Sequence, residues 1–260
     1  MSTPNPYAAP KAALADETVV LSADFVPGGE SRPAGHGWRW IADGWDLFKR
    51  QPAMWIGITL LLFIIFIGAS LIPLLGLFSG LFWPVFVAGI AIGCRALHEG
   101  GELKLAHLFA GFQQRLGTLL GVGAISSLIA LAVTFAVFAA MGGGMLATLG
   151  TEDPEALAGL GVALLLAILI ISALLLPLVM AMWFAPLLVV FHEMGAWESM
   201  KQSFTGCLRT IVPFLIYGLV LLVLAVLAAV PLGLGWLVLW PVIAASIYTA
   251  YRDVYFRPRG

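Results

Sequence analysis

Charged residues are scarce in this sequence, and their scarcity excludes an ordinary soluble domain. Lys, Arg, Asp and Glu make up 10% of the 260 residues, whereas a typical globular domain carries about 25%. Hydrophobic residues make up 61%, and the mean hydropathy is +1.02. The composition therefore predicts an all-α protein that crosses a membrane several times, and no nucleic acid is expected as a partner.

Cysteine is almost absent as well. Only Cys94 and Cys207 occur, and neither stands in a CxxC or zinc-type spacing. Both lie close to segments that we place below on the cytoplasmic side of the membrane. We therefore expect two reduced thiols rather than a disulfide.

Catalytic and cofactor motifs are also missing. The sequence has no HExxH, no P-loop, no GxSxG and no dinucleotide fingerprint. We predict no catalytic, cofactor-binding or metal-binding residue, and hence no enzyme activity. No Asp, Glu, Lys or Arg lies deep within an apolar segment, which argues against a proton relay or an ion-coupled transporter.

The most prominent feature that is present is an uncharged apolar run from Leu157 to His192, which contains the motif Met182-Trp183-Phe184-Ala185-Pro186. About 20 helical residues cross a hydrocarbon core of roughly 30 Å, and a straight helix over this run would be roughly 54 Å long. We expect bends at Pro177 and Pro186. Each proline frees a backbone carbonyl that needs a partner, so we expect this run to be buried inside a helix bundle.

Six segments are long and apolar enough to span a membrane. The predicted spans are Ala53–Leu74, Leu77–Leu97, Thr118–Met141, Leu157–His192, Ile211–Leu232 and Leu234–Tyr251. The third and fourth have surplus length. Either both extend together on the side of their connecting loop, or they break at Gly142-Gly143-Gly144 and at Pro177.

Three amphipathic stretches precede successive pairs of spans: residues 38–50, 103–116 and 196–209. Their predicted apolar faces are Trp38/Ile41/Trp45/Phe48, Leu105/Leu108/Phe109/Phe112 with Leu116, and Trp197/Met200/Phe204/Leu208. Helices rich in Trp and Phe commonly lie at the membrane interface. The predicted unit is therefore one interfacial helix followed by a transmembrane hairpin.

A tryptophan–proline motif recurs in the second helix of each hairpin. Trp83-Pro84-Val85 and Trp240-Pro241-Val242 are 157 residues apart, and the register holds without a gap to Arg95 and Arg252. Trp183 to Pro186 is a looser third copy. The pattern predicts three repeats, with the even-numbered spans as an inner layer. Trp83, Trp183 and Trp240 would either line a cavity or, as is commoner, serve in packing and interfacial anchoring.

The distribution of charge predicts the orientation. All thirteen Lys and Arg fall in the N-terminal segment, the loops after the second and fourth spans, or the C-terminal tail. The loops on the other side carry only Glu152, Asp153 and Glu155 as charges. The positive-inside rule then places both termini in the cytoplasm. We expect a disordered cytoplasmic tail over residues 1–37, a membrane domain over 38–252 and a basic cytoplasmic tail over 253–260.

Two similar pairs, His98-Glu99 and His192-Glu193, each close an even-numbered span. Two imidazoles with two carboxylates would suit a metal site at the membrane surface. Titratable residues also mark the membrane boundary simply because water solvates them there. We favour the second interpretation, since no third ligand stands at a suitable spacing.

Four motifs resemble an uncharacterised family of proteobacterial six-span inner-membrane proteins. They are Gly37-Trp38-Arg39-Trp40-Ile41, Gly93-Cys94-Arg95-Ala96-Leu97, Met182-Trp183-Phe184-Ala185-Pro186 and Tyr251-Arg252-Asp253. The resemblance covers most of the chain from Asn5-Pro6-Tyr7 onward. More distantly, the plan is similar to the membrane domain of some glycerophosphodiester phosphodiesterases, whose soluble catalytic domain has no counterpart here. The resemblance implies location and architecture but transfers no catalytic residue.

Three functions are compatible with these features. The first is a non-enzymatic integral inner-membrane protein that acts in envelope or membrane homeostasis through membrane lipids or a membrane-protein partner. The second is a permease or channel for a lipid-like or apolar solute. The third is a membrane enzyme that uses the cytoplasmic rim. The missing catalytic set and the uncharged spans favour the first.

Overall fold

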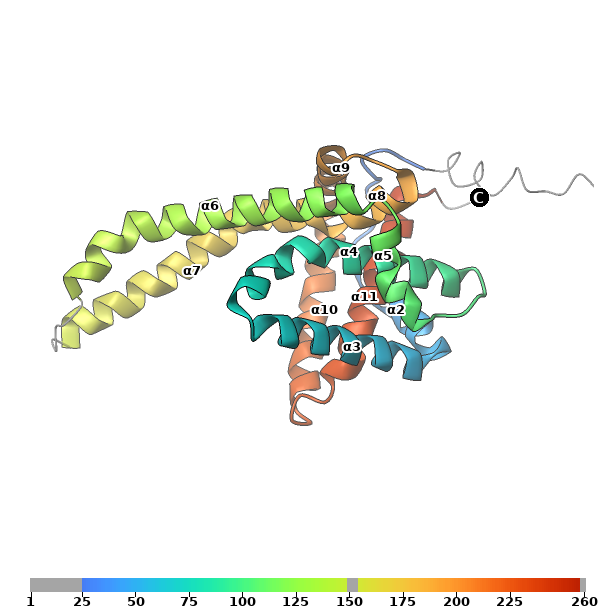
Figure 1. Ribbon diagram of the computed structural model, residues 1–260, viewed down its shortest axis with the longest axis horizontal. Helices are drawn as coiled ribbons and strands as arrows, with labels where there is room; N and C mark the ends of the chain where they lie inside the picture. Colours follow the sequence, from blue (N-terminus) through green and yellow to red (C-terminus); the bar gives the residue numbers. More distant parts are fainter. Residues whose placement is uncertain (1–24, 149–153, 258–260) are drawn as a thin grey trace, which may run out of the picture.

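The computed structural model describes residues 25–148 and 154–257, and these residues form an all-helical protein (Figure 1). The described part contains no named strand, only an isolated antiparallel bridge between Phe25 and Phe256. The all-α prediction is confirmed. Residues 1–24 of the predicted N-terminal tail, and Glu152 and Asp153 of the acidic loop, lie outside the described residues.

Short helices alternate with pairs of long ones along the chain. The elements are α2 (His36–Arg50), α3 (Pro52–Ser70), α4 (Pro73–His98), the 3-10 helix η1 (Leu105–Phe109), α5 (Ala110–Gln113), α6 (Leu116–Thr148), α7 (Pro154–Trp183), α8 (Ala185–His192), α9 (Ala196–Arg209), α10 (Ile211–Ala229) and α11 (Trp236–Tyr255). Prolines occupy the first turn of α3, α4 and α8, where the missing N–H has no helical partner to lose.

Five segments within the described residues are long and apolar enough to cross a membrane. They are Pro52–Ser70, Ser79–His98, Leu116–Ala140, Ala158–His192 and Ile211–Ala229. Helix α11 has 20 residues, but its tyrosines, with Arg252 and Asp253, make it less apolar. Five of the six predicted spans thus coincide with helices that are long and apolar enough to cross a membrane. The sixth span and the organisation in three repeats stay predictions.

Helices α6 and α7 form a hairpin that extends well beyond the other helices (Figure 1). They have 33 and 30 residues. Helix α6 continues across Gly142–Gly144 and α7 continues across Pro177. The surplus length is therefore accommodated by a matched extension toward their connecting loop, the first of the two possibilities that the sequence left open.

The prediction that the run from Leu157 to His192 is buried in a bundle was wrong for most of its length. Only 6% of its most apolar stretch is buried, against 56% for that of α4. Side chains such as Leu165, Ile168 and Leu169 are exposed. Hydrophobicity alone does not distinguish contact with lipid from contact with protein, so no feature of this run indicated the difference. Phe184 and most of α8, at the end of the run, lie in the core.

The predicted break in this run occurs at Phe184, between α7 and α8. In an uninterrupted helix the Phe184 N–H would donate to the Met180 carbonyl four residues earlier. Here it donates to Ser203 Oγ at 2.9 Å, and that hydroxyl donates to the Met180 carbonyl at 2.7 Å. A side chain of α9 is thus inserted into the hydrogen-bond ladder, a recognised cause of helix breaks. It also keeps both backbone groups satisfied.

Helix α2 packs closely against α10 and α11. Ile41 and Phe48 of its predicted apolar face are buried, but Trp38 and Trp45 are 56% and 42% exposed. The buried face is formed instead by Gly37, Trp40, Ile41, Gly44, Leu47 and Phe48. The face that packs on α10 and α11 thus differs from the predicted apolar face, because the two glycines, which add nothing to an apolar pattern, lie at the contact and rotate it away from the tryptophans. The placement of the predicted face at the membrane interface stays a prediction.

Helix α9 has the predicted bounds, but its contact face also differs from the prediction. Met200 is buried and Trp197 and Leu208 are exposed. The remaining buried positions are small or polar: Ser199, Ser203, Gly206 and Cys207. Exposed tryptophans at the membrane–water boundary are typical anchors.

The middle amphipathic stretch, residues 103–116, forms no single helix. It is divided into η1 and α5, and Arg115, which follows them, has a positive φ of 55° that ends the helical course before α6.

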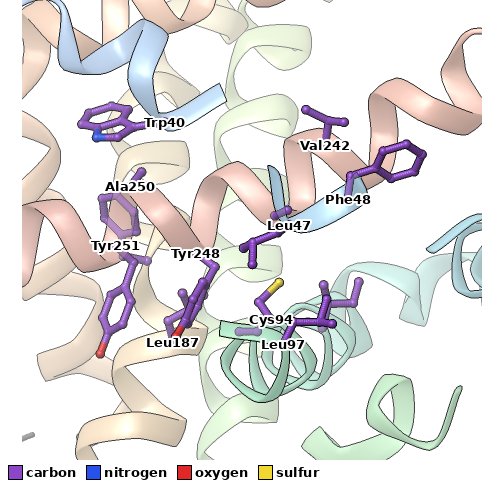
Figure 2. Packing of buried hydrophobic residues seen from close by; sticks show 14 of the residues in the cluster. Trp40, Leu47, Phe48, Cys94, Leu97, Leu187, Val242, Tyr248, Ala250 and Tyr251 are labelled. Carbon is purple, nitrogen blue, oxygen red and sulfur yellow. The ribbon is translucent and has the colours of Figure 1, made fainter. Parts of the chain in front are cut away.

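The main hydrophobic core lies where α2, α3, α4, α8 and α11 meet (Figure 2). Both cysteines are free and buried. Cys94 lies in this core beside Leu97 (Figure 2). Burial raises the pKa of the Cys207 thiol to about 12, so this thiol is protonated at neutral pH.

The close approach of α2 and α11 yields a testable prediction. A Cβ at Gly44 would lie 2.8 Å from the backbone N of Ser246 and 2.9 Å from the carbonyl O of Val242. Gly44→Ala should therefore lower the stability by about 1–3 kcal/mol through overpacking, measured as a lower melting temperature in detergent.

Gly218→Ala in α10 is the matched control, since nothing lies within 4 Å of a Cβ added there. In a helix this change should be neutral or stabilising by about 0.5–1 kcal/mol. Equal melting temperatures for the two variants would contradict the close α2–α11 contact.

Candidate functional site

A cavity of about 390 Å³ lies between α4, the α7–α8 segment and α11. We call it the tryptophan cavity. Its lining residues are Trp83, Val87, Ile90, Ala91, Val179, Met182, Trp183, Pro186, Leu187, Trp240, Ile243, Ala244, Ile247 and Tyr248. The three tryptophans of the recurring motif therefore share one cavity. The helices around it are those predicted to form the inner layer.

The tryptophans also pack, so the two roles weighed from the sequence are combined. The ring centroids of Trp83 and Trp240 lie 5.9 Å apart at an interplanar angle of 87°. Trp183 stands edge-on to Phe214 and Tyr217 of α10, at 5.7 and 6.1 Å. Such edge-to-face contacts fix the rings against their neighbours. The buried Trp183 Nε1 has no hydrogen-bond acceptor within the described residues.

The tryptophan cavity is apolar and reaches the protein surface. No charged residue lines it, and the Tyr248 hydroxyl is one of its few polar groups. Trp83 is 36% and Val179 is 47% exposed. The cavity therefore opens between α4 and α7, along helices that are apolar enough to lie in a bilayer.

A second cavity of about 190 Å³, lined by charged as well as aromatic residues, adjoins the first at Tyr248, which lines both. We call it the rim pocket. Its lining residues are Arg95, His98, Glu99, Phe191, His192, Tyr248, Tyr251, Arg252 and Phe256. It lies one helical turn beyond the tryptophan cavity on each helix, because Arg95 follows Ala91, Phe191 follows Leu187 and Arg252 follows Tyr248, each by four residues.

Polar contacts hold the rim pocket together. Arg95 Nε donates to Glu99 Oε1 at 2.7 Å, and the Arg95 guanidinium lies 5.7 Å from the centre of the Phe191 ring. His192 Nε2 and the Tyr251 hydroxyl are 2.6 Å apart. Arg252 contacts His98 Nε2. Chain segments about 60 to 155 residues apart in sequence are thus linked at this end of the helices.

The two His-Glu pairs separate in the structure. His98, Glu99 and His192 line the rim pocket, whereas Glu193 is largely exposed and lies 3.9 Å from Arg115 Nη1. Within the described residues, no three His, Cys, Asp or Glu side chains are placed to hold a metal ion together. These pairs mark the ends of α4 and α8 and offer no metal-ligand set.

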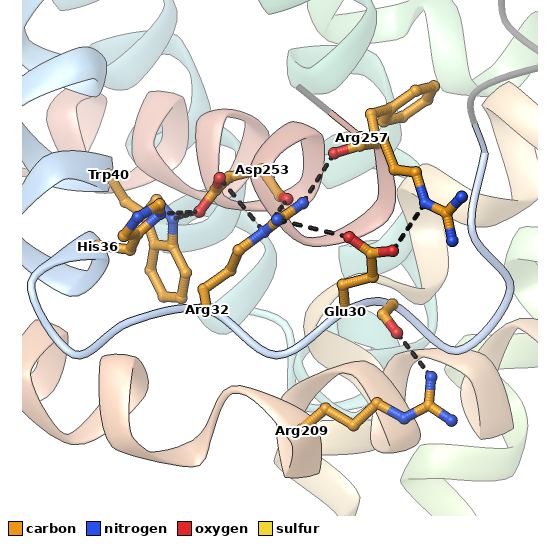
Figure 3. Close-up of polar contacts among 9 residues, drawn as sticks. Glu30, Arg32, His36, Trp40, Arg209, Asp253 and Arg257 are labelled. Atoms are coloured by element: carbon orange, nitrogen blue, oxygen red, sulfur yellow. Dashed lines mark hydrogen bonds and ion pairs between the residues drawn. The ribbon is translucent and has the colours of Figure 1, made fainter. Parts of the chain in front are cut away.

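Residues that the sequence analysis assigned to the tails form a third group, centred on Asp253 (Figure 3). The Asp253 carboxylate accepts hydrogen bonds from His36 Nδ1 at 2.8 Å and Trp40 Nε1 at 2.7 Å. Arg32 donates from Nε to the Asp253 carbonyl at 2.7 Å and from Nη2 to the Phe256 carbonyl at 2.8 Å. These partners are more than 200 residues apart, so no local sequence pattern reveals them.

The segment before α2 is attached to the end of α11 along its length. The N–H groups of Val26 and Glu30 donate to the carbonyls of Tyr255 and Val254, each at 2.9 Å. Glu30 pairs with Arg257 at 2.8 Å, and Arg209 donates to the Gly29 carbonyl at 2.6 Å (Figure 3). Gly28 and Gly29 have positive φ values of 76° and 69°, which favour glycine.

An outer pocket of about 510 Å³ lies between this segment, α2 and α11. Its charges are mixed. Arg32, Arg39, Arg50, Arg252 and Arg257 line it together with Asp43, Asp46 and Asp253. Burial raises the pKa of Asp43, and nearby Arg39 partly opposes that rise. Because opposite charges alternate here, the outer pocket resembles a structural ion-pair network more than a site for one ligand charge.

Loss of the Asp253 carboxylate should destabilise this end of the protein. Asp253→Ala leaves His36 and Trp40 without their acceptor and removes the ion pair between the carboxylate and Arg32, and unpaired part-buried donors cost about 1–3 kcal/mol. We expect a lower melting temperature in detergent and faster proteolysis of residues 25–35.

Asp46→Ala is the control, because the Asp46 carboxylate pairs only with exposed Lys49 within the described residues, at 2.8 Å. A surface pair of this kind is worth at most about 1 kcal/mol. If Asp46→Ala proved as damaging as Asp253→Ala, the Asp253 network would not be what holds the N-terminal segment.

Comparisons with known proteins give one clear relationship. A probable inner membrane protein of Burkholderia thailandensis is 31% identical to this chain over 249 residues, which cover 84% of this chain and 89% of that protein. No protein-family profile matches the sequence, and no solved structure matches it significantly. The similarity to the membrane domain of glycerophosphodiester phosphodiesterases is not shown by these comparisons and stays a prediction.

Proposed function

This chain belongs to the family of that probable inner membrane protein of Burkholderia thailandensis, and we propose that it binds a membrane lipid inside its helix bundle and catalyses no reaction. Its helices and its relative make it a transmembrane protein of the inner membrane. The proposed role is in membrane or envelope homeostasis, through the lipid that it holds.

The tryptophan cavity is the observation that carries this proposal. Its volume of about 390 Å³ falls in the range of about 300–1,000 Å³ that is usual for ligand sites. A volume of this size suits part of one acyl chain. An ion or a polar solute would lose its hydration against an apolar wall without gaining partners.

The opening of the cavity supports the same occupant. The exposed edges of Trp83 and Val179 mark the opening between α4 and α7. In a bilayer this surface meets acyl chains, so a lipid chain enters the cavity without crossing water. A permease for lipid-like solutes would need a second opening on the far side, and no observation favours one.

The proposed orientation places the rim pocket and both termini in the cytoplasm, with α11 as the sixth span. Positive charge marks this side of the protein: Arg95 and Arg252 line the rim pocket, and Lys104 lies in the connection that follows α4. Glu155 lies in the first turn of α7, at the far end of the α6–α7 hairpin. Residues 236–251 of α11, which precede Arg252, extend about 24 Å at about 1.5 Å each, most of a hydrocarbon core of roughly 30 Å.

Single cysteines test this topology. Leu232→Cys lies in the exposed turn between α10 and α11, and Lys201→Cys lies on the exposed side of α9. In intact spheroplasts an impermeant maleimide should label position 232 and not position 201, because the native thiols are buried. Labelling of position 201 alone would reverse the orientation, and labelling of both in intact spheroplasts would contradict the six-span arrangement.

Filling the cavity tests lipid binding. Ala244 lines the cavity, and Ala244→Phe should occupy part of the space for the acyl chain. After mild detergent extraction, native mass spectrometry should detect lipid bound to the parent and much less bound to Ala244→Phe. Ala139→Phe on the exposed face of α6 is the matched control and should retain lipid as the parent does.

Two results would contradict the proposal. If the parent retained no lipid, or if Ala244→Phe retained as much as the control, the cavity would not be a lipid site. An enzyme at the rim would appear differently. The combined change of His98, Glu99, His192 and Glu193 to Ala would then abolish complementation of a deletion strain while the variant still folds, inserts and binds lipid, whereas our proposal expects every variant that binds lipid as the parent does to complement.

A further inference from the structure

We propose that the rim pocket binds the headgroup of an anionic phospholipid, one with a net negative charge, whose acyl chain lies in the tryptophan cavity. This inference rests on the proposed function, since it requires a lipid in that cavity. It adds a headgroup class and two binding residues, Arg95 and Arg252.

The two cavities form a single site in their geometry. Tyr248 lines both of them. On α4, α8 and α11 the rim residue follows a cavity residue by four positions, hence on the same face and about 6 Å further along the axis. An apolar volume that ends in a polar pocket matches an amphiphile, whose chain and headgroup are joined in the same way.

The charge of the rim pocket is positive. Two arginines, Arg95 and Arg252, and one carboxylate, Glu99, line it, so the sum is +1 with neutral histidines. Glu99 is bonded to Arg95 through Nε at 2.7 Å, which leaves the terminal nitrogens of that guanidinium as donors. Arg252 has no carboxylate partner within the described residues and contacts the imidazole of His98. Arginine is well suited to binding phosphate oxygens.

The helix ends at the rim do not cancel this charge. The C-termini of α4, α8 and α11 meet there, and free carbonyls at helix C-termini carry partial negative charge. Other arginines already bond these carbonyls: Arg50 bonds Leu97 at 2.6 Å, Arg115 bonds Glu193 at 2.7 Å and Arg32 bonds Phe256 at 2.8 Å. Arg95 and Arg252 are not among the arginines that bond these carbonyls, so the positive charge of these two side chains is not used at the helix ends.

The internal repeat points to the same two residues. Arg95 and Arg252 are 157 residues apart, as are Trp83 and Trp240. Each arginine thus follows its cavity tryptophan by 12 positions on α4 and on α11. Because the spacing is the same on both helices, α4 and α11 each contribute one tryptophan to the tryptophan cavity and one arginine to the rim pocket.

Headgroup preference is the measurement that tests this proposal. The parent is incubated in detergent with equal amounts of phosphatidylglycerol and phosphatidylethanolamine that carry identical acyl chains, and the bound lipid is quantified by native mass spectrometry. We expect enrichment of phosphatidylglycerol, which has a net negative charge. The double variant Arg95→Gln/Arg252→Gln should lose about tenfold in that enrichment, because charge-assisted hydrogen bonds are lost.

Two control variants keep the result interpretable. Arg95→Lys/Arg252→Lys retains both charges and should retain most of the preference. Lys49→Gln/Lys201→Gln removes two exposed charges that pair with acids on their own helices and should behave as the parent does. A preference unchanged in the Gln variant, or lost equally in the Lys49/Lys201 control, would overturn the assignment to Arg95 and Arg252.

The outcomes for the two proposals are distinguishable. A parent that binds lipid without headgroup preference overturns this inference and leaves the proposed function standing. A parent that binds no lipid overturns both. An excess of inorganic phosphate should leave the lipid bound; if phosphate alone raised the melting temperature as much as phosphatidylglycerol does, the pocket would be a site for a free oxyanion and the inference would fail.

Discussion

The Ser203 hydroxyl replaces the helical hydrogen bond that is missing between Phe184 and Met180, and the arrangement of the site depends on this interaction. It allows the long apolar run to divide into α7, which is exposed beside α6, and α8, which is buried in the core. Without a partner from α9, two backbone groups would be unsatisfied in an apolar environment, at a cost of several kcal/mol each. The break places Trp183 at one cavity and Phe191 and His192 at the next.

Local features of the sequence predicted a large part of this architecture. Five spans, the bounds of α9 and the break before Pro186 follow from hydrophobic length, periodicity and proline chemistry, which act within one segment. The tryptophan–proline motif marked the helices around the cavity. The all-α class and the membrane location required nothing beyond composition.

The parts that the sequence did not predict depend on contacts between distant segments. Gly37 and Gly44 determine which face of α2 meets α10 and α11, and a hydrophobic pattern gives no weight to glycine. The Asp253 network joins His36 to Asp253, which were predicted to lie in opposite tails, and also reaches Trp40 of α2. The exposure of α7 could not be predicted either, because lipid-facing and protein-facing residues are equally apolar.

The central claim is that an acyl chain occupies the cavity among Trp83, Trp183 and Trp240. Photocrosslinking with a phospholipid that carries a diazirine near the middle of one acyl chain tests this claim directly, with the crosslinked peptides identified by mass spectrometry. Our account predicts crosslinks to cavity residues such as Met182 and Ile247, which Ala244→Phe removes. Crosslinks confined to exposed faces of α6 and α10, and unchanged in that variant, would contradict it.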